Sequence, residues 1–276
     1  MPFARHDGDP VDRLPPLRRM MPYLMPTRNE AYVLFEQQVA SAPSREFLDA
    51  FNADRPAERR ATQFHLLLGA LARVLHEFPR LNRFVVGGRH YQRRGIWISF
   101  SGKQRMDMDA PVYARKLEFF PDERLGAMVD RIHDVIGAGR AGRESASDRE
   151  VGTLLRLPGP LLHVAVRIGR WLDAFGLLPR AMLADDPLYS SAFVANLGSV
   201  GLDAAYHHLF EHGTTPIFVA MGRTHRAPFV ADDGSVVSRE IFVLRYTFDE
   251  RTEDGFYAAR GLARLKGLLE DPAELA

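Results

Sequence analysis

The 276-residue sequence contains no cysteine. This absence excludes disulfides, thiolate metal sites and a cysteine nucleophile. An excess of charge of either sign is also absent, because 36 basic residues face 35 acidic ones and the net charge is +1. No global electrostatic field would therefore gather DNA, RNA or anionic lipid, and we expect no nucleic-acid partner. Only three of the basic residues are lysines. An arginine-favouring genome produces the same bias, so we assign it no function.

Long apolar runs are missing as well. No stretch approaches the roughly 20 uninterrupted apolar residues of a membrane span. Residues 1–16 are polar and broken by prolines, without the apolar stretch of a secretory signal. We therefore expect a cytoplasmic protein whose residues 1–16 form a disordered or draped N-terminal arm. The content of 46% hydrophobic and 26% charged residues is that of a globular protein long enough to bury a large core.

Apolar periodicity predicts both helices and strands along the chain. Tyr32, Leu34 and Val39 are the apolar positions of an imperfect strand-like alternation, and Ser44 is a plausible N-cap for the helix that follows. Because strands and helices are interleaved without a regular βαβ period, we predict an α/β fold with a mixed sheet. The predicted helices are 44–52, 62–78, 122–136 and 262–269, and the predicted strands are 31–40, 83–86, 96–100, 191–197, 216–221 and 241–248.

Two patterns resemble ligand sites without the context that such sites need. Residues 137–142 match the GxGxxG dinucleotide pattern, but a predicted helix precedes them where that motif needs a strand. We interpret these glycines as the cap of the helix and the start of a flexible loop. His207, His208 and His212 form an HHxxxH cluster, in which the last two would share a helix face at metal-ligand spacing. No third ligand is evident nearby, so we predict no metal site, and a histidine acting as a base is the stronger interpretation.

Residues 160–175 (PLLHVAVRIGRWLDAF) predict an unusually apolar helix, with a proline in its first turn and Gly176 just past its end. His163, Arg167 and Arg170 line one narrow stripe, and nearly everything else is apolar. Such a helix must be buried, packed on another subunit or laid on a membrane surface. Burial or subunit contact is the prediction that we prefer.

The most informative segment is 247–255, which reads TFDERTEDG after a predicted strand and before a predicted helix. Residues 195–201, ANLGSVG, also end a strand. Together they resemble the catalytic domain of the 2-oxo-acid dehydrogenase acyltransferases, which are relatives of chloramphenicol acetyltransferase. That family carries a phenylalanine–aspartate–histidine–arginine run, then two residues, then aspartate–glycine. It also carries a serine–asparagine–leucine–glycine strand end before a glycine turn.

The resemblance extends over residues 17–269, because further segments follow in the order of the family. These are residues 17–20, 31–40, 78–82, 96–100 and 222–223. The resemblance implies a chloramphenicol acetyltransferase-like two-layer sandwich, with a mixed sheet packed by helices. It implies a single domain over 17–276 with a helical insertion at about 142–186. No lipoyl or subunit-binding module has room before residue 17.

The family's chemistry implies specific roles, and two positions depart from it. In the family a histidine takes the proton of a thiol, commonly that of coenzyme A, and the thiolate attacks a thioester. A hydroxyl residue steadies the oxyanion, and the sites lie between subunits of a trimer. Here Glu250 stands in place of the histidine, while Phe193 and Ala195 occupy the hydroxyl positions. Proton transfer from a thiol to an unperturbed glutamate is uphill by about 6 kcal/mol, against about 3 kcal/mol for histidine.

We therefore predict a coenzyme-A-dependent acyltransferase with an altered active site, using coenzyme A or an acyl-CoA as co-substrate and no metal. Two alternatives remain open: a catalytically inactive trimeric scaffold or binding module of the same fold, and a membrane-surface acyltransferase that uses residues 160–175. We expect a homotrimer or a higher multiple that acts on a small-molecule acyl donor and acceptor. The predicted catalytic residues are Glu250, Asp254, Arg251, Asn196 and His208, and the predicted substrate-binding residues are Gly198, Ser199, Gly255 and His207.

Overall fold

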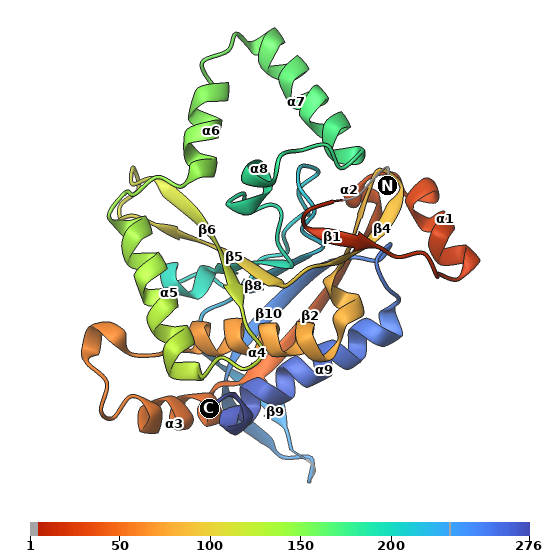
Figure 1. Cartoon of the computed structure of the whole chain (residues 1–276). Helices are drawn as coiled ribbons and strands as arrows, with labels where there is room; N and C mark the ends of the chain where they lie inside the picture. Colours follow the sequence, from red (N-terminus) through yellow and green to blue (C-terminus); the bar gives the residue numbers. More distant parts are fainter. Residues whose placement is uncertain (1–4, 232) are drawn as a thin grey trace.

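A mixed β-sheet forms the centre of the molecule in the computed structural model, which describes residues 5–231 and 233–276 (Figure 1). Within these residues the sheet has seven strands, six of them in the order β2-β10-β8-β7-β5-β6, while β9 pairs with the N-terminal half of β10. β7 runs parallel to β5 and β8, and the other pairs are antiparallel, so the predicted mixed sheet is confirmed. The strands are β2 (Tyr32–Ala40), β5 (Ile96–Lys103), β6 (Val112–Phe119), β7 (Ala192–Asn196), β8 (Ile217–Met221), β9 (His225–Val230) and β10 (Val236–Asp249).

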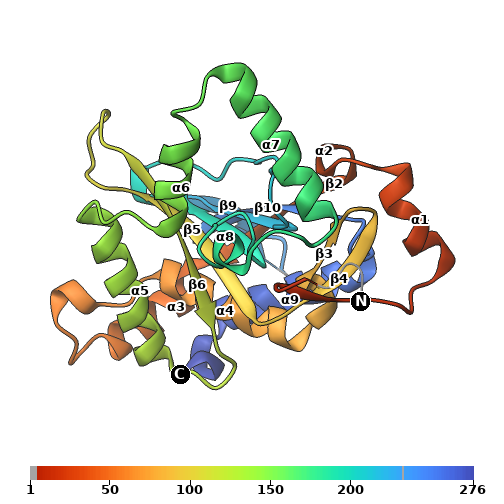
Figure 2. The ribbon, with the colours of Figure 1, turned by 45° about the horizontal axis from the view of Figure 1, so that its top comes forward.

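A layer of helices covers one face of this sheet (Figures 1 and 2). It consists of α3 (Ser41–Phe51), α4 (Gln63–Glu77), α5 (Leu125–Arg140) and α9 (Gly255–Glu270). The main core lies between the two layers, where apolar side chains of α4 and α9 meet those of β5, β8 and β10. The predicted two-layer α/β sandwich is therefore confirmed. Its largest fully buried side chains include Leu66, Leu67, Leu68, Leu75, Ile98, Phe100, Phe242 and Leu244.

Helix α4 begins with a capping interaction that buries a histidine. The backbone N–H of Thr62, the N-cap residue, donates to Nδ1 of His65 at 3.1 Å. The neutral ring therefore carries its proton on Nε2, which is buried and has no hydrogen-bond partner among the described residues. Burial lowers the pKa of His65 from its ordinary value of 6.5 to about 4, and the neighbouring His133 and Arg55 act in the same direction.

This histidine makes the fold acid-sensitive. The unfolded chain takes up a proton at a pH near 6.5 and the folded chain only near 4, so stability falls as the pH drops through this window. The difference corresponds to about 3 kcal/mol. In His65→Gln the amide carbonyl can still accept from Thr62, but the side chain does not titrate. We therefore expect the free energy of unfolding to fall by about 3 kcal/mol less in this variant than in the native chain when the pH is lowered from 7 to 4. Urea unfolding at both pH values measures this, with His76→Gln on the exposed side of α4 as control. Identical pH dependence in native and His65→Gln protein would contradict the assignment.

A smaller sheet packs beside the main one and receives the N-terminal segment. It has the order β1-β4-β3, formed by β1 (Gly8–Pro10), β4 (Arg89–Arg93) and β3 (Arg83–Val86). The described part of the predicted arm therefore pairs with β4, while residues 1–4 lie outside the described residues. Two helices follow before the main sheet begins, α1 (Pro16–Leu24) and α2 (Arg28–Ala31).

Several local predictions are wrong, for identifiable reasons. Helix α3 starts at Ser41, so Ser44 is not its N-cap, and the Ser44 hydroxyl donates to the Ser41 carbonyl inside the helix. In β2 the side chains facing the helix layer include Val33 and Phe35, whereas Tyr32 and Leu34 are exposed on the other face. That strand is imperfectly alternating because both faces carry apolar residues. Strands β4, β6 and β9 were not predicted, and short 3-10 turns occur at Ala57–Arg59, Pro79–Asn82, Leu197–Val200 and Pro272–Leu275.

Three helices lie between α5 and β7, at the position of the expected insertion. They are α6 (Ala146–Leu154), α7 (Gly159–Ala174) and α8 (Arg180–Ala184), and α6 and α7 project away from the two layers (Figure 1). The glycines at 137 and 139 lie inside α5, and Gly142 follows its end in a left-handed conformation with φ +69°. Helix α7 was predicted to be buried or to contact another subunit. Burial within the chain is wrong, since most of its apolar side chains are exposed in the single chain. Among the described residues, no helix combines the length and apolar content needed to cross a bilayer.

Candidate active site

Glu250 lies in the turn that follows the end of β10. The turn leads directly into α9, whose N-cap is Asp254: its Oδ1 accepts from the backbone N–H of Tyr257 at 3.0 Å. This hydrogen bond lowers the pKa of the Asp254 carboxyl. The Glu250 side chain is half-buried, and within residues 5–231 and 233–276 its carboxylate forms no hydrogen bond or ion pair. Its backbone is held, because the Glu250 N–H donates to the Ala31 carbonyl at 2.9 Å and its carbonyl accepts from Arg18.

A buried ion pair fixes one side of this turn. Arg251 and Asp249 form two hydrogen bonds, at 2.9 Å from Nε and 2.8 Å from Nη2, and both side chains are almost fully buried. Nη1 of Arg251 also donates to the carbonyls of Met25 and Pro26 at 3.1 and 3.2 Å. Arg251, predicted as a catalytic residue, therefore points into the protein, and the structure gives it the role of positioning the Glu250 turn.

The Glu253 carboxylate fixes the other side of the turn. Glu253 is buried among three arginines, with nearest oxygen–nitrogen distances of 3.9 Å to Arg18, 3.3 Å to Arg80 and 3.6 Å to Arg83. Both flanks of the turn are thus tied to the body by charged groups, whereas the Glu250 carboxylate is left free.

The predicted histidine cluster does not lie on a helix, which corrects the metal-spacing argument. Residues 202–216 form neither helix nor strand, because this segment lies across the sheet face opposite the helix layer. The described residues contain no group of three or more His, Cys, Asp or Glu that could hold a metal ion. His212 instead contacts Asp186 at 3.2 Å.

His207 and His208 lie close to β10. The His207 ring stacks on Phe218 with centroids 3.9 Å apart, and the Thr247 hydroxyl donates to the His207 carbonyl. The His208 ring stacks on that of His207 at 4.6 Å and is exposed. Burial lowers the pKa of His207 below its ordinary value, so its ring is neutral near pH 7. Thr247, whose hydroxyl contacts the His207 backbone, is three residues from Glu250, about 10 Å along an extended strand.

Asn196, Gly198 and Ser199 form a tight turn at the end of β7. Oδ1 of Asn196 accepts from the Ser199 N–H at 3.2 Å, and the Ser199 hydroxyl donates to the Asn196 carbonyl at 2.7 Å. Gly198 must lack a side chain, because a Cβ atom there would lie 2.8 Å from the carbonyl oxygen of Gly222. The Asn196 side chain is thus half-buried and engaged in capping its own turn.

The strand register separates this turn from Glu250 within one chain. Asn196 pairs with Met221 of β8, and Met221 pairs with Leu244 of β10. Glu250 follows Leu244 by six residues and lies beyond the opposite end of β8, about 20 Å away along the strand direction. The structure therefore brings Glu250, Asp254 and Gly255 together, and separately Asn196, Gly198 and Ser199, but does not join the two groups in a single subunit.

Ser190 and Ser191 do not supply the missing hydroxyl near β7. Ser190 and Ser191 precede the strand and are fully buried. The Ser190 hydroxyl bonds to the Pro187 and Ala192 carbonyls and to Thr215, and the Ser191 hydroxyl accepts from the Trp97 N–H at 2.9 Å. Phe193 stacks on Phe218 with centroids 5.3 Å apart. The sequence could not reveal that both serines are engaged in the interior, because Thr215 and Trp97, which contact Ser190 and Ser191, are far from them in the chain.

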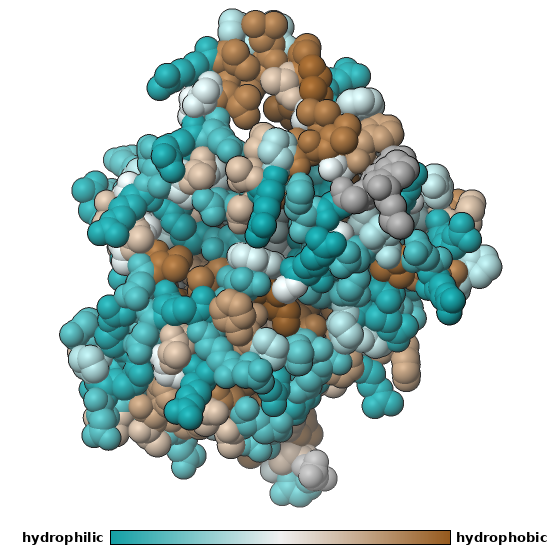
Figure 3. Space-filling model, in the orientation of Figure 1, coloured by the Kyte–Doolittle hydropathy of each residue, from teal (hydrophilic) through white to brown (hydrophobic). Residues whose placement is uncertain are grey.

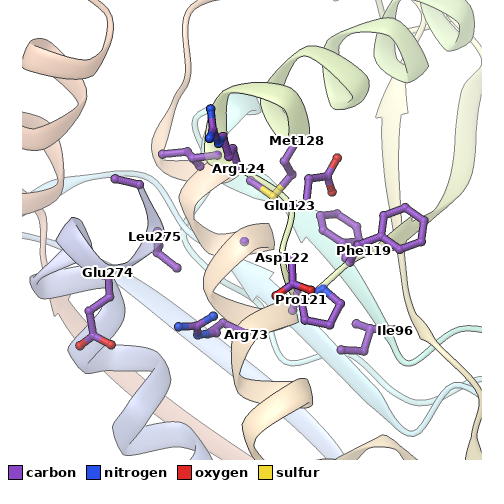
Figure 4. A pocket seen from close by; sticks show the side chains of 15 residues that line it. Arg73, Ile96, Phe119, Pro121, Asp122, Glu123, Arg124, Met128, Glu274 and Leu275 are labelled. Atoms are coloured by element: carbon purple, nitrogen blue, oxygen red, sulfur yellow. The ribbon is translucent and has the colours of Figure 1, made fainter.

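Cavities of several sizes open at the surface of the described residues. A cleft of about 340 Å³ opens between α4, the start of α5 and the C-terminal turn, lined by Arg73, Glu123 and Leu275 among others, but by no residue of the 247–255 motif (Figure 4). A smaller one of about 170 Å³ reaches the motif through Arg251 and extends to Arg170 and Asp173 at the base of α7. The only predicted site residue that borders either cavity is Arg251, so neither forms a closed active-site pocket around Glu250.

Comparisons with known proteins agree with the architecture. Residues 183–276 match the family model of the 2-oxoacid dehydrogenases acyltransferase (catalytic domain). The dihydrolipoamide acetyltransferase of Azotobacter vinelandii is 18% identical, with a TM-score of 0.63 over 97% of this chain and 98% of that one. The cubic core of a pyruvate dehydrogenase multienzyme complex is 15% identical, with a TM-score of 0.63 over 96% and 93%. A chloramphenicol acetyltransferase is 10% identical, with a TM-score of 0.55 over 95% and 99%. None of the curated protein sequences matches significantly.

These similarities confirm the family resemblance inferred from the sequence and the chloramphenicol acetyltransferase-like fold. The family model covers the C-terminal third, which contains both motifs, and the shared fold extends over nearly the whole chain. Because these solved structures are less than 20% identical to the chain, they show a shared fold and nothing further.

Proposed function

We propose that this chain is a cytoplasmic acyltransferase that moves acyl groups between thioesters and thiols, with coenzyme A or an acyl-CoA as co-substrate. Its acyltransferase-like domain spans residues 17–276, with 142–186 as an insertion. The observation that carries the proposal is the turn after β10. Ion pairs of Asp249 and Glu253 fix this turn on both sides, whereas the Glu250 carboxylate is half-exposed and unpaired among the described residues. A free carboxylate on a rigid support is suited to take a proton from a bound substrate.

The reaction proposed for this site is general-base catalysis of thiol attack. Glu250 accepts the thiol proton, the sulfur attacks the thioester carbonyl carbon, and the original thiolate leaves and recovers the proton from Glu250. The stacked pair His207 and His208 is the alternative base, since a neutral imidazole can accept a proton. Asp254 and Arg251 position the turn, while Gly198, Ser199 and Gly255 offer backbone groups to the substrate.

The site is proposed to form between copies of the chain. Glu250 and the Asn196 turn lie about 20 Å apart along the strands, so one reacting group can contact both only if a second copy supplies one of them. The sheet face opposite the helices also leaves several large apolar side chains exposed, as expected of a subunit contact. They are Tyr32, Leu34, Leu202, Tyr206 and Phe210. We propose a homotrimer or a higher multiple, since the family that the chain resembles places its sites between the subunits of a trimer.

A second candidate function is an inactive scaffold of the same fold. It is favoured by the lack of a hydroxyl at Ala195 and by the internal engagement of Ser190 and Ser191. Loss of one oxyanion donor lowers the rate by about 10²–10³. The scaffold would keep the subunit contacts and bind a partner without turnover.

One experiment separates the two functions. The purified full chain is screened against short- and long-chain acyl-CoA thioesters for thiol release, and its mass is measured by light scattering. The acyltransferase predicts thiol release above the uncatalysed rate and a mass near 93 kDa or a multiple of it, which is three times the 31.1 kDa of one chain. A stable oligomer without thiol release from any thioester, and without gain in Glu250→His, would support the scaffold. A monomer would contradict both proposals.

A further inference from the structure

Helices α6 and α7 form a hairpin with a fixed base and a free tip (Figures 1 and 2). At the base, Asp173 is buried and accepts from Nη1 of Arg5 at 2.7 Å. Leu172 packs there on a small cluster of Leu178, Leu183 and Tyr189. From this anchor the hairpin leads away from the sheet, and the connection between its two helices, residues 155–158, is fully exposed.

The hairpin exposes more apolar surface than a water-soluble surface normally carries. Apolar side chains gather over it at the top of the space-filling view (Figure 3). These apolar side chains project from both sides of α7. A partner protein that contacted only one stripe of the helix would therefore leave some of them in water. The exposed large apolar residues of the hairpin are Val151, Leu154, Leu155, Leu157, Leu161, Val164, Val166, Ile168, Trp171 and Phe175.

From the end of α6 through most of α7 the charges have one sign, while Asp148, Glu150 and Asp173 flank this stretch. Residues 151–172 contain Arg156, Arg167 and Arg170 and no aspartate or glutamate, although acidic and basic residues are balanced over the whole chain. A surface that combines leucines, an exposed tryptophan and arginines matches the chemistry of a bilayer with anionic headgroups. A second copy of this chain, with its net charge of +1, supplies no excess of negative charge for these arginines. Charge complementarity therefore favours an anionic lipid surface as the occupant.

We propose that the α6–α7 hairpin docks the protein on an anionic membrane surface. The leucines around the helix connection, Leu154, Leu155 and Leu157, enter the boundary between headgroups and acyl chains. Arg156, Arg167 and Arg170 supply the positive charge that attracts the lipid phosphates. The docking is peripheral, and it does not depend on whether the chain is an active acyltransferase or an inactive scaffold.

Vesicle sedimentation of the full chain tests this docking. We expect it to pellet with vesicles of equal parts phosphatidylglycerol and phosphatidylcholine, and to bind pure phosphatidylcholine vesicles and high-salt samples far more weakly. Replacing the three arginines with glutamine should weaken binding to the anionic vesicles by about a hundredfold. Leu155→Glu, Leu157→Glu and Leu161→Glu combined should abolish it. All these side chains are exposed, so thermal unfolding should remain close to that of the native chain.

A matched control adds three glutamates elsewhere. Met108→Glu, Val230→Glu and Val236→Glu replace equally exposed apolar residues outside the hairpin and should retain vesicle binding. Three outcomes would overturn the proposal. The first is that the native chain does not pellet with anionic vesicles, and the second is that the control loses binding as fully as the hairpin variants. The third is that the hairpin glutamates lower the oligomer mass without altering sedimentation. The last result would assign the hairpin to a subunit contact.

Discussion

Replacing Glu250 with glutamine is expected to lower the rate of acyl transfer by about 10²–10⁴-fold, the usual contribution of a general base. The amide has the size of the carboxylate but cannot accept a thiol proton near neutral pH. Because the Glu250 carboxylate has no hydrogen-bond or ion-pair partner among the described residues, stability should change by less than about 0.5 kcal/mol. The measurements are kcat/KM for thiol release and the thermal midpoint of the same samples.

The control for this variant is Glu46→Gln, an exposed carboxylate on α3, which should change neither rate nor stability. An unchanged rate in Glu250→Gln together with a large loss in His207→Ala or His208→Ala would move the base to the histidine pair. An unchanged rate in all three variants would exclude general-base catalysis by either group and would contradict the proposed mechanism.

Removing the buried Arg251 side chain is expected to destabilise the fold strongly. Arg251→Met leaves the Asp249 carboxylate buried without its cation and the Met25 and Pro26 carbonyls without their donor. Breaking a buried pair in this way costs about 3–5 kcal/mol. For a domain of this size we expect a fall in the thermal midpoint of about 5–9 °C. Chemical unfolding and calorimetry of the two proteins measure both quantities.

An exposed ion pair provides the comparison. Arg223 pairs with Asp203 at 2.9 Å, and both side chains are more than half exposed, so Arg223→Met should cost at most about 1 kcal/mol. The double variant Arg251→Met with Asp249→Leu should recover part of the loss, because it removes the stranded charge. Equal stability of Arg251→Met and the native chain would show that the turn is held by other contacts.

The sequence by itself determined the class of the fold and its kinship. The apolar periodicity of α4 predicted its extent to within a residue at each end, because a long and strongly amphipathic helix has a local signal that burial only reinforces. Likewise the TFDERTEDG and ANLGSVG motifs indicated the resemblance to the 2-oxo-acid dehydrogenase acyltransferases, and their Asp254, Asn196 and Gly198 serve local caps and turns.

Short and two-sided elements were predicted less well. Tyr32 and Leu34 of β2 are as apolar as Val33 and Phe35, so only the position of the helix layer decides which pair is inside. His207, His208 and His212 were given a helical spacing that their segment does not adopt. That segment instead lies across the sheet, where Phe210 contacts Phe193 and His207 contacts Phe218, on the two strands that flank the segment in the chain.

Only the tertiary structure decided what the 247–255 motif can do. The sequence gives Glu250 four charged neighbours within four residues, but not which of them are neutralised by partners. The fold pairs Asp249 with Arg251 and surrounds Glu253 with three arginines from two distant segments, and among the described residues the Glu250 carboxylate has no partner. It also places the Asn196 turn at the far end of the same strands and leaves the apolar hairpin α6–α7 in solvent. Local sequence encodes caps, turns and periodicity, whereas pairing and exposure depend on contacts between residues far apart in the chain.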